Sequence, residues 1–229
     1  SVHVECVSED GQSASRICTR AIPRYEVPQQ DFPTAEDNED LQGLVLDMKE
    51  LSEVPDGQFG ATIGLLCAAY KNWIEKERAR MADPKSLLSK HEKAAKRAIA
   101  RCEETLKRIQ TGIDLLDANP MAATAFRFAN QAMRQQRVHS IFARQVRRQE
   151  RKVEDGYADI DEAKNRSWRP FQLAFLLLNL PSCTNLHHPD RSDKTKAIAD
   201  LLWFPTGGGK TEAYLGLAAY VMALRRLEG

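Results

Sequence analysis

The residues with the clearest chemical potential form the string Phe204-Pro205-Thr206-Gly207-Gly208-Gly209-Lys210-Thr211. Consecutive glycines let backbone N–H groups converge on a phosphate, while the lysine reaches the terminal phosphates and the threonine hydroxyl binds Mg²⁺. Lys210 and Thr211 are therefore the candidate catalytic residues, with the Thr211 hydroxyl as a candidate Mg²⁺ ligand. The candidate nucleotide-binding residues in this region are Thr206, Gly207, Gly208, Gly209, Lys210, Thr211 and Glu212. The predicted cofactors are ATP and Mg²⁺.

The segments on either side of this loop suit a phosphate site. Residues 198–204 predict a short buried strand, and residues 212–227 predict a helix whose N-terminus would face the anion. The alternative is a chance glycine-rich turn, but a strand before and a helix after it favour nucleotide binding. Where the commonest form of the loop has its first glycine, this sequence has Phe204. The form Pro-Thr-Gly-x-Gly-Lys-Thr resembles the first motif of superfamily-2 helicases and DNA translocases.

A second candidate, Gln172, lies 38 residues before Lys210. It ends the string Trp168-Arg169-Pro170-Phe171-Gln172, which opens an apolar helix. This string resembles the adenine-recognising motif that precedes the phosphate loop in many such helicases. A glutamine amide can both donate to and accept from an adenine edge, which guanine would mismatch. Gln172 and Arg169 are therefore candidate nucleotide contacts, and the alternative for Gln172 is a helix-start residue facing water. The long spacing to the loop predicts an insertion around residues 181–196.

Charge is distributed unevenly along the chain, although the net charge is only +1. Residues 1–58 carry 13 acids and 4 bases, whereas residues 84–152 carry 6 acids and 16 bases. Seven cations, Arg134, Arg137, Arg144, Arg147, Arg148, Arg151 and Lys152, lie in one segment with Glu150 as its only acid. We expect Arg144, Arg147, Arg148 and Arg151 to follow a DNA phosphate backbone. The alternative is a solvated helix face or a partner for the acidic residues 36–56.

Composition limits the class of protein. The 229 residues are 42% hydrophobic and 28% charged, which is typical of a soluble globular protein of one or two domains. The longest apolar run, residues 173–180, is far shorter than the roughly 20 residues that a bilayer-spanning helix needs, so no membrane segment is expected. Five cysteines without paired spacing indicate neither a disulfide framework nor a zinc site, and a cytoplasmic location is expected. A start without methionine and an end inside a helical pattern suggest a piece of a larger protein.

Hydrophobic patterning divides the chain into residues 1–58 with short strands and an acidic connector, a helical accessory domain at 59–166, and residues 167–229. The resemblance to superfamily-2 motifs implies that this last part is the beginning of a motor domain. Helices are expected over 59–74, 84–116 and from 122 toward 148, because apolar residues recur there at steps of three and four. The expected fold class is α/β, a mostly helical region followed by the first strand and helix of a RecA-like P-loop domain. Residues 161–164 mimic an acidic Mg²⁺ box but precede the loop, so an exposed helix face is expected there.

The phrases RPFQLAFLLLNL and WFPTGGGKTEAYLGLAAY resemble the helicase-like subunit family of DISARM anti-phage defence systems, called DrmA. The resemblance rests on these two phrases, and residues 126–133 resemble this family more weakly. It implies an ATP-dependent helicase or translocase that engages DNA in bacteria together with a second subunit, DrmB. The hydrolytic acidic box and arginine finger would lie in the remainder of the helicase chain beyond Gly229.

Two other functions stay open from the sequence. The chain could be a helical interaction module whose nucleotide loop acts only as a switch, or part of an ATP-driven restriction or remodelling translocase that never separates strands.

Overall fold

The computed structural model describes residues 2–6, 14–19, 32–204 and 208–229. Contacts divide the chain into two units, Ser1–Gln30 and Asp31–Gly229, and each is described by itself. In the first unit, strand β1 (Val2–Cys6) pairs antiparallel with β2 (Ala14–Thr19), with Val4 opposite Ile17. The candidate functional residues all belong to the second unit.

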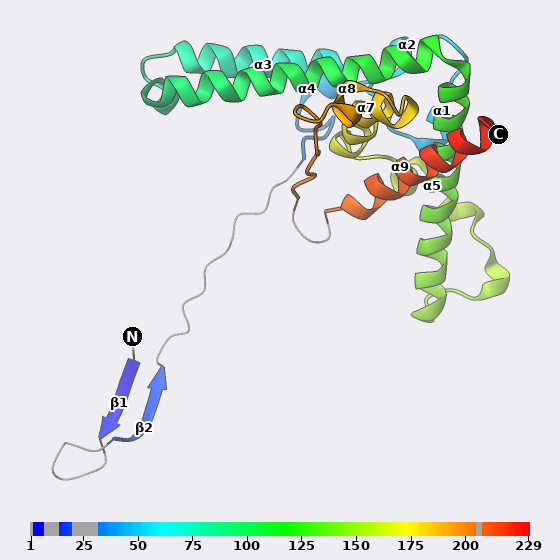
Figure 1. The fold of residues 1–229 in the computed structure, drawn as a ribbon. Helices are drawn as coiled ribbons and strands as arrows, with labels where there is room; N and C mark the ends of the chain where they lie inside the picture. Colours follow the sequence, from blue (N-terminus) through cyan, green and yellow to red (C-terminus); the bar gives the residue numbers. More distant parts are fainter. Residues whose placement is uncertain (1, 7–13, 20–31, 205–207) are drawn as a thin grey trace. The chain divides into compact units, whose positions relative to one another are not determined.

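The second unit is helical (Figure 1). Its α-helices are α1 (Met48–Ser52), α2 (Phe59–Ile63), α3 (Leu65–Ala82), α4 (Glu92–Ala118), α5 (Pro120–Arg147), α6 (Ala163–Arg166), α7 (Pro170–Thr184), α8 (Pro189–Ser192) and α9 (Lys210–Leu227). Short 3₁₀ turns cover Glu39–Leu41, Leu87–His91, Val153–Asp155 and Ala158–Ile160. Among the described helices, none combines the length and the apolar content that crossing a membrane requires.

The expectation of an α/β fold with a RecA-like strand and helix is wrong. Residues 198–204, which were predicted as a buried strand, form no regular secondary structure, and Leu201 and Trp203 are 81% and 72% exposed. A central strand needs neighbours that pair with its backbone N–H and C=O groups. Within the described residues of the second unit there is no strand to provide them, so the phosphate loop is preceded by an irregular segment.

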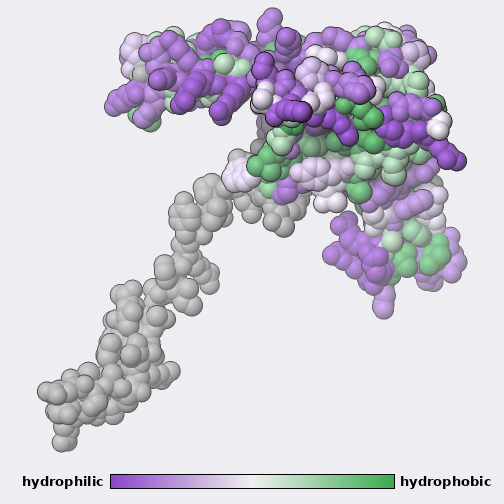
Figure 2. All heavy atoms as spheres, in the orientation of Figure 1, coloured by the Kyte–Doolittle hydropathy of each residue, from purple (hydrophilic) through white to green (hydrophobic). Residues whose placement is uncertain are grey.

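The two long helices α3 and α4 run antiparallel side by side (Figure 1). The predicted seam of α4 is present, and its burial increases along the helix: Ile109, Ile113 and Leu116 are buried, whereas Ile99 is only half-buried. The helix begins at Glu92 rather than near Pro84, because the residues before it form a 3₁₀ turn. Figure 2 shows that the surface is hydrophilic at the end of α3 and α4 where α4 begins, and more apolar around α7 and α9.

Helix α5 is the support on which the loop-bearing helix α9 packs. Asn119 caps α5 by accepting hydrogen bonds from the N–H groups of Met121 and Ala122, at 3.0 and 3.1 Å, and Pro120 occupies the first helical position. Small side chains on both helices are fully buried and allow close approach, namely Ala122, Ala125 and Ala129 on α5 and Ala213 on α9.

Trp168, just before α7, contacts both α5 and α9. Its side chain is 2% exposed, and its indole N–H donates to Asn130 Oδ1 at 2.7 Å. A Cβ at Gly216 of α9 would lie 2.7 Å from the Trp168 ring. The start of α7 is thereby fixed against both α5 and α9.

Helices α4 and α7 also approach unusually closely. A Cβ at Gly112 would lie 2.0 Å from the carbonyl oxygen of Leu177, so only glycine fits at this crossing. The surrounding core contains fully buried Ile113, Leu173 and Leu176. This crossing sets the position of α7, whose first turn carries Gln172.

Candidate functional site

The phosphate loop ends at the junction with α9, where Gly209 is the N-cap and Lys210 begins the helix. Gly209 has a φ of +89°, in the left-handed region that favours glycine. A Cβ there would lie 2.5 Å from Gln172 Nε2, so a larger residue would displace the end of the Gln172 side chain. The first N–H groups of a helix have no intrahelical partner and attract anions. The candidates Thr206 and Gly207 lie outside the described residues.

Gln172 and Arg169 both contact the loop. Gln172 is 4% exposed; its Oε1 accepts from the Arg169 backbone N–H at 2.8 Å, and its Nε2 donates to the Gly209 carbonyl at 2.6 Å. The Arg169 guanidinium donates to the Gly208 carbonyl at 2.5 Å. Gln172 therefore does not face water, and the structure brings both candidates onto the loop backbone. Adenine reading stays a prediction.

Three phenylalanines fix the residues before the loop. Phe204 stacks on Phe171 with ring centroids 4.3 Å apart, and Phe32 lies against Phe171 at 6.2 Å. The Arg169 guanidinium lies 4.5 Å from the centroid of the Phe32 ring, and Lys210 Nζ donates to the Phe204 carbonyl. Sequence reasoning missed Phe32 and the stack, because no periodic pattern connects positions 32, 171 and 204.

An ion pair anchors the same segment to α4. Both NH groups of Arg108 contact Asp200, each at 2.7 Å, in a bidentate arrangement, and Arg108 Nε lies 3.2 Å from Asp190 Oδ2. The predicted insertion thus includes α8, which is attached to α4 through Asp190.

A hydroxyl contact joins α9 to the end of α7. The hydroxyls of Tyr220 and Thr184 lie 2.6 Å apart, and burial raises the pKa of Tyr220 to about 12.

Glu212, in the first turn of α9, contacts α5. Arg137 NH1 lies 3.3 Å from Glu212 Oε1, while Arg137 Nε donates to the Asn165 carbonyl at 3.3 Å. A small polar cavity of about 110 Å³ lies beside the loop, lined by Met48, Arg137, Ser167, Arg169, Gln172, Gly209 and Glu212. The sequence counted Arg137 among the basic residues but gave no signal that it lies at the loop.

Thr211 is exposed, next to Lys210. Within the described residues, no group of three or more His, Cys, Asp or Glu side chains is arranged to hold a metal ion. A hydroxyl ligand of this kind binds Mg²⁺ together with phosphate oxygens of the nucleotide rather than in a protein cage. The role of Thr211 stays a prediction.

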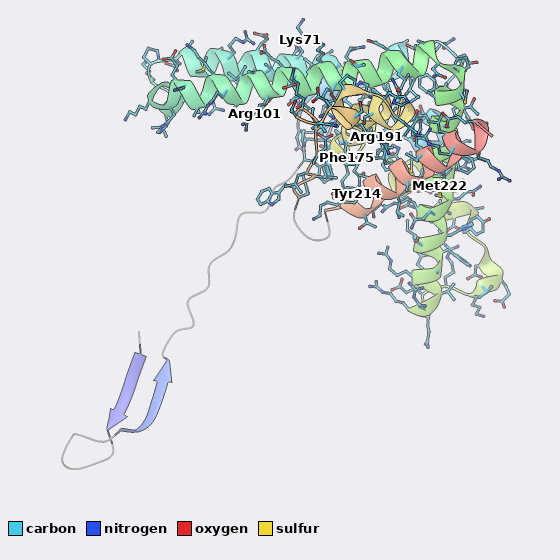
Figure 3. The ribbon with its side chains drawn as sticks, in the orientation of Figure 1. Lys71, Arg101, Phe175, Arg191, Tyr214 and Met222 are labelled. Carbon is cyan, nitrogen blue, oxygen red and sulfur yellow. The ribbon has the colours of Figure 1, made fainter. Side chains whose placement is uncertain are left out.

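A larger, apolar cavity of about 580 Å³ lies between α3, α4, α7 and residues 200–202. Tyr70, Trp73 and Phe171 contribute aromatic walls, and the paired Arg108 and Asp200 contribute polar atoms. Phe175 also lines it and packs edge-on against Tyr214 of α9, with centroids 5.5 Å apart; Figure 3 labels both residues.

The four DNA-binding candidates divide into two groups. Arg144, Arg147 and Arg148 are exposed at the end of α5, and the described residues form no ion pair with Arg144 or Arg147. Arg151 is different, because it donates to Asp159 at 2.8 Å and to the Gly156 carbonyl at 2.7 Å. DNA contact by these residues stays a prediction.

Of residues 161–164, predicted as an exposed helix face, Glu162, Ala163 and Lys164 are exposed, whereas Asp161 is part of a charge network. Arg134 Nε donates to it at 2.9 Å and Arg166 NH1 at 2.7 Å, while Arg166 Nε also donates to Asp47 at 2.8 Å. The hydrogen bonds from Arg134 hold the pKa of Asp161 well below its usual range. Burial opposes ionisation of Asp47, but the hydrogen bonds from Arg166 still lower its pKa. The network joins α1, α5 and α6.

The second unit is thus helical, and its helix α9 begins at a loop that is capped by Gly209 and followed by Lys210. No protein-family model matches the chain. The chain is similar to the DISARM protein DrmA of Bacillus paralicheniformis, with 36% identity over 225 residues. The alignment covers 96% of this chain and 18% of that protein. The chain therefore spans less than a fifth of the length of that relative.

Proposed function

We propose that this chain supplies the phosphate-binding loop of an ATP-dependent DNA helicase or translocase in bacterial anti-phage defence. The observation that carries the proposal is the junction at Gly209, where a positive φ favours glycine and where Gln172 and Arg169 bind the carbonyls of Gly209 and Gly208. The similarity to the DISARM protein DrmA supports the defence role. A DrmB-like subunit and DNA are the proposed partners.

The donor set at the loop fits a nucleotide. Lys210 and the N-terminal end of α9 provide positive potential for phosphates, and the Thr211 hydroxyl is suited to Mg²⁺. Gln172 and Arg169 hold the carbonyls of Gly209 and Gly208, so that the loop backbone is oriented before a ligand arrives. Bound Mg·ATP would supply the phosphoryl group whose hydrolysis drives a motor.

The decisive experiment compares Lys210→Ala with a matched control in the full-length protein. We expect Lys210→Ala to reduce the rate of ATP hydrolysis by about 10²-fold or more, because a preorganised cationic donor to the phosphates is lost. Lys71→Ala removes an exposed lysine from α3, far along the chain from the loop, and should leave hydrolysis unchanged. Both variants should melt like the wild type. Normal turnover by Lys210→Ala would exclude the proposed role of the loop.

A helical interaction module with a nucleotide switch is the second candidate. This function is favoured by the helical architecture of residues 32–204, in which an irregular segment instead of a strand precedes the loop. Such a module would bind ATP with loss of affinity in Lys210→Ala, yet the full-length protein would show no DNA-stimulated hydrolysis. Measurement of binding and of hydrolysis on the same preparations separates the two functions.

A further inference from the structure

We propose that Arg137 couples occupancy of the phosphate loop to the far end of α5. This inference rests on the proposed nucleotide binding at the loop and adds a positioning residue that acts through Glu212. We call residues 138–162 the α5 arm: the last turns of α5 and the return segment that leads to α6.

Arg137 lies where the loop meets the arm. Its guanidinium contacts Glu212 of α9 and the Asn165 carbonyl of α6, both at 3.3 Å. These distances are at the long end of charge-assisted hydrogen bonds, which are usually 2.7–2.9 Å. Arg137 also lines the small polar cavity together with Gly209 and Arg169. The residue is thus within reach of the loop but only loosely held by its present partner.

A phosphate at the start of α9 would change this contact. Glu212 is stabilised there by the helix N-terminus and by Arg137. A polyanion at the same N-terminus competes for both, and phosphate oxygens accept bidentate hydrogen bonds from arginine. We therefore expect nucleotide binding to draw Arg137 away from Glu212 and the Asn165 carbonyl.

The arm is positioned to respond because α5 continues without a break from Arg137 to Arg147. One turn before Arg137, Arg134 binds Asp161 in the return segment. The arm packs on itself through Tyr157, which lies 4.8 Å from His139 and 5.9 Å from Phe142, measured between ring centroids. A change at Arg137 thus reaches the same helix that presents the exposed Arg144 and Arg147. Nucleotide state would thereby alter the basic end of α5.

The experiment measures amide hydrogen exchange across residues 138–152 with and without a Mg²⁺-bound, nonhydrolysable ATP analogue. In the wild type, the analogue should change exchange rates in the arm by about fivefold or more, a typical coupling between sites. Arg137→Ala should still bind the analogue but lose this change, whereas Arg137→Lys should retain part of it because the charge remains. Lys71→Ala, which removes an exposed lysine from α3 outside the measured segment, is the control and should respond like the wild type.

An arm response in Arg137→Ala equal to that of the wild type would overturn the coupling, as would an unresponsive arm in wild-type protein that binds the analogue. If Arg137→Ala does not fold, Glu212→Gln removes the charge that faces Arg137 from α9, and at analogue concentrations that saturate this variant the arm response should again be reduced. Failure of the proposed function has a different signature. In that case neither the wild type nor Lys210→Ala binds the analogue, and the coupling falls with it.

Discussion

The contact between α4 and α7 makes a strong prediction about Gly112→Ala. The added Cβ would lie 2.0 Å from the Leu177 carbonyl oxygen and 2.7 Å from its carbon, both backbone atoms. To restore an ordinary 3.4 Å contact the helices must separate by roughly 1.4 Å, the difference between 3.4 and 2.0 Å. Overpacking of this kind costs about 1–3 kcal/mol. We take the upper end, because the separation also loosens fully buried Ile113 and Leu116.

Alanine recovers about 1 kcal/mol of helix propensity relative to glycine, so the expected net loss is about 2 kcal/mol. For a chain of this size, that corresponds to a melting temperature lower by about 4–8 °C, measured by circular dichroism at 222 nm. The neighbouring Thr111→Ala is the control: Thr111 is exposed, and its hydroxyl binds only the Lys107 carbonyl of its own helix. Its stability should change by no more than about 0.5 kcal/mol. If Gly112→Ala melted at or above the wild-type temperature, the close helix crossing would be refuted.

Three further predictions concern the loop, the charge network and the basic end of α5. Gln172→Ala should weaken ATP binding because the Gly209 carbonyl loses its partner, and it should narrow the preference over GTP because the amide proposed to match adenine is lost; an unchanged preference in competition binding would limit Gln172 to a structural role. The depressed pKa of Asp161 implies stabilisation that is complete above the ordinary carboxyl pKa near 4 and is lost as the pH falls further. Asp161→Asn should therefore lower stability at pH 7 by about 1–3 kcal/mol and reduce the loss on acidification, and identical melting curves of both proteins from pH 7 to pH 3 would contradict this. Replacing Arg144, Arg147 and Arg148 by Gln should weaken DNA binding for all sequences and lower the salt slope by about 0.9 per lost duplex phosphate contact, whereas an unchanged slope would mean a solvated face.

Periodicity predicted much of the helical architecture. The three-and-four spacing anticipated the region of α2 and α3, most of α4, and α5 from residue 122 onward, whereas the cap at Asn119 and the start at Pro120 came from the structure. These signals are local, since the apolar face and the cap of a helix lie within its own sequence. The prediction of a strand at residues 198–204 was wrong because strand formation is not decided locally. Their apolar content is compatible with a strand, but a strand also depends on partners elsewhere in the chain, and none lies in the described part of this unit.

The candidate site was predicted in part. Motif resemblance selected Gln172 and Arg169, and the structure places both on the backbone of the loop residues Gly208 and Gly209. The motif resemblance did not select Arg137 or Phe32. Their contacts with the loop region arise from the packing of α5 against α9 and from a segment far along the chain, so no short motif contains them.

The irregular approach to the phosphate loop affects how mutations in this protein should be interpreted. The approach is held by side-chain contacts, among them the Arg108–Asp200 pair on α4 and the Phe171–Phe204 stack on α7, instead of a ladder of backbone hydrogen bonds. Backbone ladders tolerate most side-chain replacements, whereas a side-chain anchor is lost with one codon change. Loss-of-function alleles should therefore arise at Arg108, about a hundred positions before the loop, while every glycine and the lysine of the loop stay intact. A genetic survey limited to the loop itself would miss them.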